Sequence, residues 1–162
     1  MAAGDTLDKF TALHNEPPSA SFATLDTRNQ HPVLDFDGGS NEEAVFRGIM
    51  PQNYDGGGLD VILHVSHSSD ITNDTDWDAQ FERTSDGSLD IDGDGFAAIQ
   101  STDGTSVPGT AGIIQKITVS FTAGQIDGIT AGDSYRLKVI RDAVSDASTT
   151  DAELSAVEVR EN

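Results

Sequence analysis

A short acidic run is the part of the sequence whose residue types and spacing best suit metal chemistry. Asp90, Asp92 and Asp94 stand at alternate positions in it, with Gly93 before Asp94 and Gly95 after it. Carboxylates spaced in this way can converge on one calcium ion. The full calcium-loop pattern also needs a glutamate at its twelfth position, where the chain has Ser101, and no helices are expected on either side. Calcium and a plain solvated turn both remain open, because Asp-Gly pairs are common in turns. We expect no cofactor other than this calcium.

The other polar motifs give no support for catalysis. His64 and His67 are three positions apart, so an extended chain places them on opposite faces, which does not suit two ligands of one metal. The sequence contains no Gly-Xaa-Ser-Xaa-Gly elbow and no phosphate-binding glycine loop. Acid pairs such as Glu42-Glu43 could serve a glycosidase, but they have little specificity among 28 acidic residues. We therefore expect a protein that is not an enzyme.

The charge balance limits the choice of partners. Nine Lys and Arg residues stand against 28 Asp and Glu residues, a formal net charge of -19, so we expect neither nucleic acid nor an anionic membrane as a partner. A few cations on predicted strands could form a local positive stripe that meets an acidic partner: Arg47, Arg136, Lys138 and Arg141. The alternative is pairing within the molecule, worth less than about 1 kcal/mol for each exposed pair.

Two strands with one apolar face each form the centre of the expected fold. In the run 59–67, Leu and Val at odd positions alternate with mostly polar residues, which predicts a strand with one buried face. In the run 77–83, Trp77, Ala79 and Phe81 share one face in the same way. We interpret the two as neighbouring antiparallel strands. Trp77 is then a core residue, while Tyr54, beside a glycine triplet, is expected to be exposed and able to stack on a sugar.

About eight short strands separated by turn signals, and no long helix, predict an all-β protein. We expect an antiparallel β-sandwich of the jelly-roll type over residues 21–162, with an extended N-terminal arm over residues 1–20 in which two prolines block a helix. Leu7, Phe10 and Leu13 of the arm could pack on a neighbouring subunit. The alternative is a frayed terminus. The first residues lack the basic and apolar regions of a signal peptide.

Several segments resemble a family of small tailed-bacteriophage virion proteins. The likeness spans about residues 6–160 and is carried by the runs 22–29, 31–36, 45–48, 51–58, 77–83, 132–139 and 141–142. The resemblance implies a jelly-roll cement or decoration protein that binds the outer surface of a capsid, often as a homotrimer. It implies no catalytic residue.

The resemblance sets the expected function, partners and location. We expect a structural virion protein that is made in the host cytoplasm and binds the major capsid protein and itself. The residues expected at these contacts are Leu7, Phe10, Leu13, Arg47, Arg136 and Arg141. The alternative is a carbohydrate-binding or structural module of a phage tail or head fibre. For that alternative, exposed aromatic residues would be the distinguishing feature.

Overall fold

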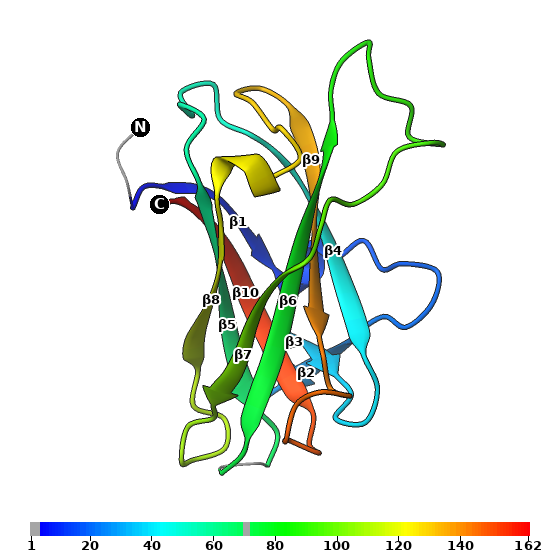
Figure 1. Ribbon diagram of the computed structural model, residues 1–162. Coiled ribbons are helices and arrows are strands. Elements are labelled where there is room, and N and C mark those ends of the chain that lie inside the picture. The colour runs from blue at the N-terminus through cyan, green and yellow to red at the C-terminus, as the bar shows by residue number, and fades with distance from the viewer. Residues whose placement is uncertain (1–3, 70–71) are drawn as a thin grey trace.

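The computed structural model describes residues 4–69 and 72–162, and the regular secondary structure of this part is almost entirely β-strand (Figure 1). Residues 1–3 of the predicted arm lie outside this part. The ten strands are β1 (Thr6–Thr11), β2 (Thr24–Arg28), β3 (His31–Phe36), β4 (Glu42–Ile49), β5 (Leu59–His67), β6 (Asp74–Thr84), β7 (Gln100–Ser106), β8 (Gln115–Phe121), β9 (Ser134–Arg141) and β10 (Ala152–Glu161). Two single 3-10 turns complete the elements, η1 (Ala12–His14) and η2 (Ala123–Gln125).

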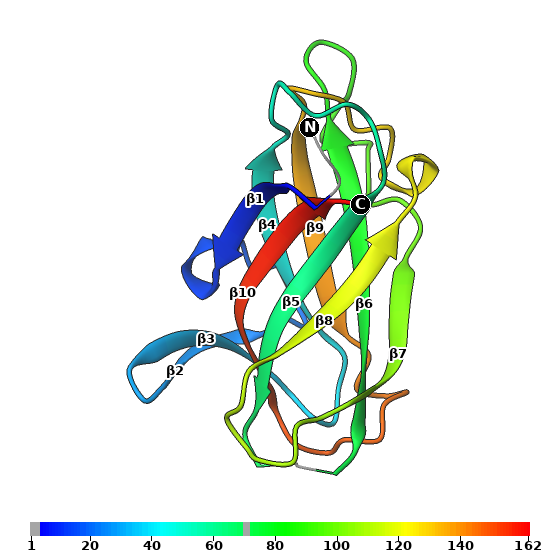
Figure 2. The ribbon, with the colours of Figure 1, turned by 90° about the vertical axis from the view of Figure 1, so that its left-hand side faces the viewer.

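The strands form two antiparallel sheets that pack face to face (Figures 1 and 2). Sheet A has the order β2-β3-β10-β5-β8, and β1 also pairs with β10. Sheet B has the order β4-β9-β6-β7. The predicted all-β sandwich of the jelly-roll type is confirmed, with ten strands in the described part where about eight were expected. Within that part, no helix is long and apolar enough to cross a membrane.

The core lies between the sheets and follows the predicted alternation. Leu59, Val61, Leu63 and Val65 of β5 are fully buried, as are the inward side chains of β6, such as Trp77. Strands β5 and β6 are not hydrogen-bonded neighbours, however, because β5 belongs to sheet A and β6 to sheet B. The expectation that they pair was wrong. Their apolar faces belong to the same core and approach it from opposite sheets.

The N-terminal segment is part of the sandwich. Thr6–Thr11 forms β1 and pairs with β10, with Lys9 opposite Glu158. Phe10 is only 4% exposed and stacks on Phe46 with ring centroids 5.3 Å apart. We expected Phe10 to pack on a neighbouring subunit. The structure instead places it in the core of its own chain, because strand pairing turns its ring inward.

Strands β7 and β10 depart from simple alternation. Strand β7 runs through Gly104 and is mostly exposed or half-buried. In β10 the pairing with β5 shifts register between Leu154 and Ala156. This bulge places Leu154 and Val157 in the core although they are three positions apart.

Arg141 is the main buried ion of the fold. Its side chain is 0% exposed and pairs with the equally buried Asp146, with Nε 2.9 Å from Oδ2. Its remaining N–H groups donate to the carbonyl oxygens of Phe36, Ser148 and Thr150 at 2.6–3.2 Å. Arg141 was expected at a partner contact. It instead joins β9 to the loop before β10, and an external partner cannot reach it.

Candidate functional site: a polar platform on sheet A

Strands β1, β10, β5 and β8 of sheet A lie side by side (Figure 2). Their outward side chains form a polar platform. Core and outward side chains alternate along β5, β8 and the second half of β10. Strand pairing aligns the outward residues in three rows across the sheet. The platform comprises Thr11, Ala156, His64 and Lys116 in the first row, Lys9, Glu158, Ile62 and Thr118 in the second, and Thr6, Arg160, Asp60 and Ser120 in the third.

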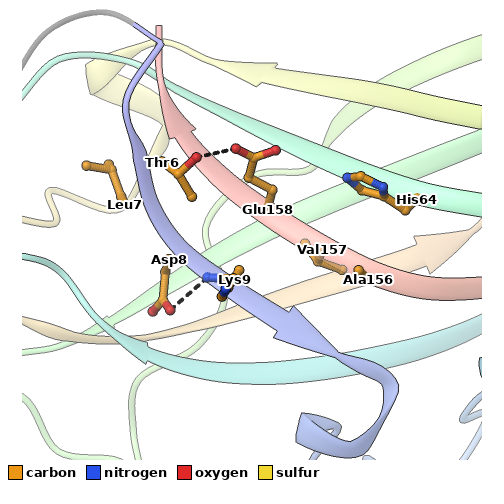
Figure 3. Close-up of a pocket in the computed structure, with 8 residues that line it drawn as sticks. All are labelled: Thr6, Leu7, Asp8, Lys9, His64, Ala156, Val157 and Glu158. Atoms are coloured by element: carbon orange, nitrogen blue, oxygen red, sulfur yellow. Dashed lines mark hydrogen bonds between the residues drawn. The ribbon is translucent and has the colours of Figure 1, made fainter. Parts of the chain in front are cut away.

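A cleft of about 680 Å³ opens where β1 lies beside β10 (Figure 3). Its polar wall is formed by Thr6, Lys9, His64 and Glu158. Figure 3 shows Thr6 and Glu158 pointing toward each other, and Asp8 on the other side of the β1 ribbon. The Asp8 carboxylate accepts a hydrogen bond from the hydroxyl of the core residue Tyr135 at 3.1 Å, so its role is structural.

Glu158 is the carboxylate at the centre of the platform. It accepts hydrogen bonds from the Thr6 hydroxyl and from Nη2 of Arg160, the latter at 3.0 Å. These hydrogen bonds, with the positive charges of Arg160 and Lys116, hold the pKa of Glu158 below its usual value. The group is therefore ionised at neutral pH and can accept further hydrogen bonds from a ligand. Asp60, in the next row, accepts a hydrogen bond from the Ser120 hydroxyl at 2.6 Å.

His64 lies half-buried in the first row, directly opposite Lys116. Burial lowers the pKa of His64, and the charges of Lys116 and Arg160 lower it further, while Glu158 acts in the opposite direction. The imidazole is therefore neutral at pH 7 and offers one donor and one acceptor. Together the platform residues supply carboxylates, hydroxyls, an imidazole and amines, which are the groups that bind sugar hydroxyls.

The predicted calcium loop lies in an exposed turn between β6 and β7. The carbonyl oxygen of Asp90 accepts hydrogen bonds from the N–H groups of Gly93 and Asp94 at 3.0 and 2.9 Å, and its carboxylate accepts one from the N–H of Asp92 at 3.0 Å. These are the bonds of a self-contained turn. Over residues 4–69 and 72–162, no three or more His, Asp or Glu side chains are grouped to hold a metal ion. Calcium binding stays a prediction.

The expected positive stripe lies on the outer face of sheet B, without Arg141. Arg47 and Arg136 are directly opposite each other on β4 and β9, and Lys138 is next to them. Arg47 is 3.4 Å from Glu16 and Lys138 is 2.7 Å from Glu43, while Arg136 pairs with the buried Glu82. The Phe96 ring also covers the Arg136 and Lys138 cations, with centroids at 4.9 and 4.5 Å. Pairing within the molecule therefore accounts for these residues.

The remaining predicted contact residues differ in how far their side chains are exposed. Leu7 is half-buried against the core, whereas Leu13 is 67% exposed. Leu13 lines an apolar groove of about 260 Å³ together with Phe22 and Leu25. Tyr54, expected to be exposed, is 5% exposed and donates its hydroxyl to the carbonyl of Gly57, so it cannot stack on a sugar. Among the Phe, Tyr and Trp residues of the described part, only Phe22 is largely exposed.

An acidic pocket that the sequence did not reveal lies at the opposite end of sheet A from the cleft. Asp35, Asp37, Glu42 and Asp151 line a space of about 120 Å³. Burial, with repulsion from Asp151 and other nearby carboxylates, raises the pKa of Asp35 to about 6. The run 35–42 is visibly acidic in the sequence. Only the pairing of β3 with β10 shows that Asp151, far along the chain, belongs beside it.

No protein-family model matches this sequence, and no curated protein sequence matches it. Solved structures share the fold at low sequence identity. A family 35 carbohydrate-binding module from an environmental isolate has a TM-score of 0.50 and 8% identity over 97% of this chain and 92% of its own. TmCBM27, a carbohydrate-binding module studied for mannan recognition, has a TM-score of 0.50 and 9% identity over 99% of both chains. A candidate sugar-binding protein of Bacteroides thetaiotaomicron has a TM-score of 0.51 and 11% identity over 96% of this chain and 88% of its own. The jelly-roll fold is thus similar to that of carbohydrate-binding modules, and nothing in these similarities indicates a phage origin.

Proposed function

We propose that this protein is a non-catalytic carbohydrate-binding module that holds a glycan on the platform of sheet A. The observation that carries the proposal is the cleft of about 680 Å³ lined by Thr6, Lys9, His64 and Glu158. It lies on an outer sheet face whose side chains are almost all hydrogen-bonding groups. Two of the similar solved structures are described as carbohydrate-binding modules, and this also favours a sugar as the ligand.

The chemistry of the platform favours recognition by hydrogen bonds. Glu158 and Asp60 are carboxylate acceptors, and the hydroxyls of Thr118 and Ser120 can donate or accept. Among the described residues, those of the platform include no Phe, Tyr or Trp, so a sugar ring has no large aromatic face to stack on. Discrimination between sugars then depends on the placement of hydroxyls, because an unpaired polar group in a binding site is costly.

A glycan array followed by titration calorimetry tests the proposal. We expect binding to at least one glycan, and at least a tenfold loss of affinity in Glu158→Gln, which removes the central charge while preserving shape. Glu16→Gln is a matched control, because Glu16 is an exposed carboxylate whose partner, Arg47, lies on sheet B. Absence of binding to every glycan, or equal losses in both variants, would contradict the proposed site.

A second candidate function is the structural virion protein implied by the sequence resemblance. The apolar groove lined by Leu13, Phe22 and Leu25 supports a contact with another protein, either the major capsid protein or further copies in a homotrimer. Their exposed fractions of 67%, 44% and 55% are high for large apolar side chains. Light scattering tests self-association, where we expect three times the chain mass for the wild type and a monomer for Leu13→Ser. A monomeric wild type that does not bind capsids would reject this candidate.

A further inference from the structure

The cations of this acidic protein differ in whether they are already paired. Seven of the nine Lys and Arg residues lie within 4.0 Å of a carboxylate oxygen: Arg28, Arg47, Arg83, Arg136, Lys138, Arg141 and Arg160. The other two are Lys9 and Lys116, for which the described residues provide no ion pair. Both are exposed. In a molecule with 28 acidic residues, two unpaired cations on one surface call for an explanation.

Both unpaired lysines belong to the platform and lie on opposite sides of it. Lys9 is on β1 and Lys116 is on β8, with β10 and β5 between them. Three strand spacings of about 4.8 Å separate the two outer strands by roughly 14 Å. Flexible lysine side chains from the two sides can therefore reach the same ligand, or neighbouring units of one polymer.

The carboxylates between these lysines already have other partners. Glu158, although opposite Lys9 in the strand pairing, accepts hydrogen bonds from Thr6 and Arg160. Asp60 accepts hydrogen bonds from Ser120 and Asn162, at 2.6 and 3.3 Å. Three cations and two carboxylates leave the platform with a formal charge of +1, on a chain of formal charge -19. The platform is thus a surface suited to an anion.

We propose that the platform binds an anionic polysaccharide and that Lys9 and Lys116 pair with its carboxylate or sulfate groups. This inference rests on the proposed carbohydrate-binding function and names its ligand class. Glu158 and Thr118 of the second row, with Asp60 and Ser120 of the third, hold the sugar hydroxyls. The two lysines supply the charge contacts. Charge is the natural source of affinity here, because the platform lacks the aromatic faces that bind neutral sugar rings in a stacked geometry. A long nucleic acid is disfavoured by repulsion from the rest of the surface.

Affinity electrophoresis in low salt tests the inference with paired polymers. The uronate arm compares polygalacturonate with its fully methyl-esterified, neutral form, and the sulfate arm compares a sulfated galactan with agarose. The wild type should be retarded by at least one anionic polymer. Its affinity for the corresponding neutral polymer should be at least tenfold lower. Raising the salt concentration to 0.5 M should weaken the interaction, because the lysines are exposed and their charges are screened.

Single and double variants assign the effect to the two lysines. Lys9→Gln and Lys116→Gln should each reduce the affinity about threefold to tenfold, and the double variant should lose at least twentyfold. Arg47→Gln removes one exposed positive charge from sheet B and is the matched control, for which we expect less than a twofold change. Circular dichroism should be unchanged, since the side chains exchanged are exposed.

The outcomes separate the inference from the function on which it rests. Equal binding of the neutral and anionic polymers, or wild-type affinity in the double variant, would overturn the anionic ligand while leaving carbohydrate binding intact. Binding to no polysaccharide would overturn both. Retardation by a 20-base-pair DNA as strong as that by the polysaccharides would show that the partner class is wrong.

Discussion

Replacing Arg141 with methionine should cost this protein a large part of its stability. The substitution keeps most of the side-chain volume but leaves the Asp146 carboxylate, 0% exposed, without its cation. The carbonyl oxygens of Phe36, Ser148 and Thr150 also lose their donor. Removing one partner of a buried ion pair costs about 3–5 kcal/mol. A domain of this kind is stable by only about 5–15 kcal/mol, so the loss is readily measured.

Urea denaturation followed by circular dichroism measures the effect. With an m-value of about 2 kcal/mol/M, a loss of about 3–5 kcal/mol lowers the urea midpoint by roughly 1.5–2.5 M. Asp146→Asn should have a similar effect, because it leaves the guanidinium buried without a counter-charge. The double variant should lose less than the sum of the two single variants, since the residues interact directly.

Arg47→Met is the matched control. Arg47 and Glu16 also form an ion pair, but their side chains are 48% and 51% exposed. An exposed pair contributes less than about 1 kcal/mol, so the midpoint should move by less than about 0.5 M. If Arg141→Met shifted the midpoint no more than Arg47→Met, the argument that Arg141 is an essential buried ion would be wrong.

Three other features lead to direct tests. The raised pKa of Asp35, about 6 against 3.8 for a free carboxyl, means that folding favours its protonated form, so the stability due to this group is present below about pH 4 and is lost as pH rises through 6. Asp35→Asn should therefore raise Tm more at pH 8 than at pH 4, and a gain independent of pH would refute this account. A Cβ atom added at Gly38 would lie 2.5 Å from the backbone of Thr149, so Gly38→Ala should cost about 1–3 kcal/mol in urea denaturation, whereas Gly124→Ala, with open space, should cost less. If the loop of Asp90, Asp92 and Asp94 binds calcium, titration calorimetry with calcium should show a heat of binding that Asp92→Asn abolishes. Equal heats for the wild type and this variant would show that the loop is a plain turn.

Alternation along single strands predicted the fold class, because it depends only on neighbouring residues. It also contained a signal for Arg141, which stands in phase with the core residues Tyr135, Leu137 and Val139. The charge of Arg141 favours the surface, whereas its position in the alternation favours the core, and the position is what the structure follows. Phe10 was missed for another reason. The register of β1 against β10 shifts between Thr6 and Asp8. This shift interrupts the alternation of β1, so the sequence shows no clear strand there.

The platform could not be predicted from the sequence because it depends on the register of distant strands. The phase of β5 turns His64 outward, and the phase of β8 does the same for Lys116. Only pairing shows that these two residues are opposite each other and that β10 brings Glu158 beside them. For the same reason, alternation alone could not distinguish hydrogen-bonded neighbours from strands in facing sheets. This is why β5 and β6 were wrongly paired.

The position of β10 has a consequence for the order in which the molecule can assemble. This strand is the last in the sequence, yet β1, β3 and β5 all pair with it, and the contact between Thr6 and Glu158 joins residues 152 positions apart. On the ribosome the chain grows at about 5–20 residues per second. Until β10 emerges, the edges of those three strands that face it keep their backbone N–H and C=O groups unpaired. The cleft beside β10 is thus among the last features to form. Folding dominated by such distant pairings takes milliseconds to seconds, so a chain stopped before residue 152 should be prone to aggregation and unable to hold a ligand.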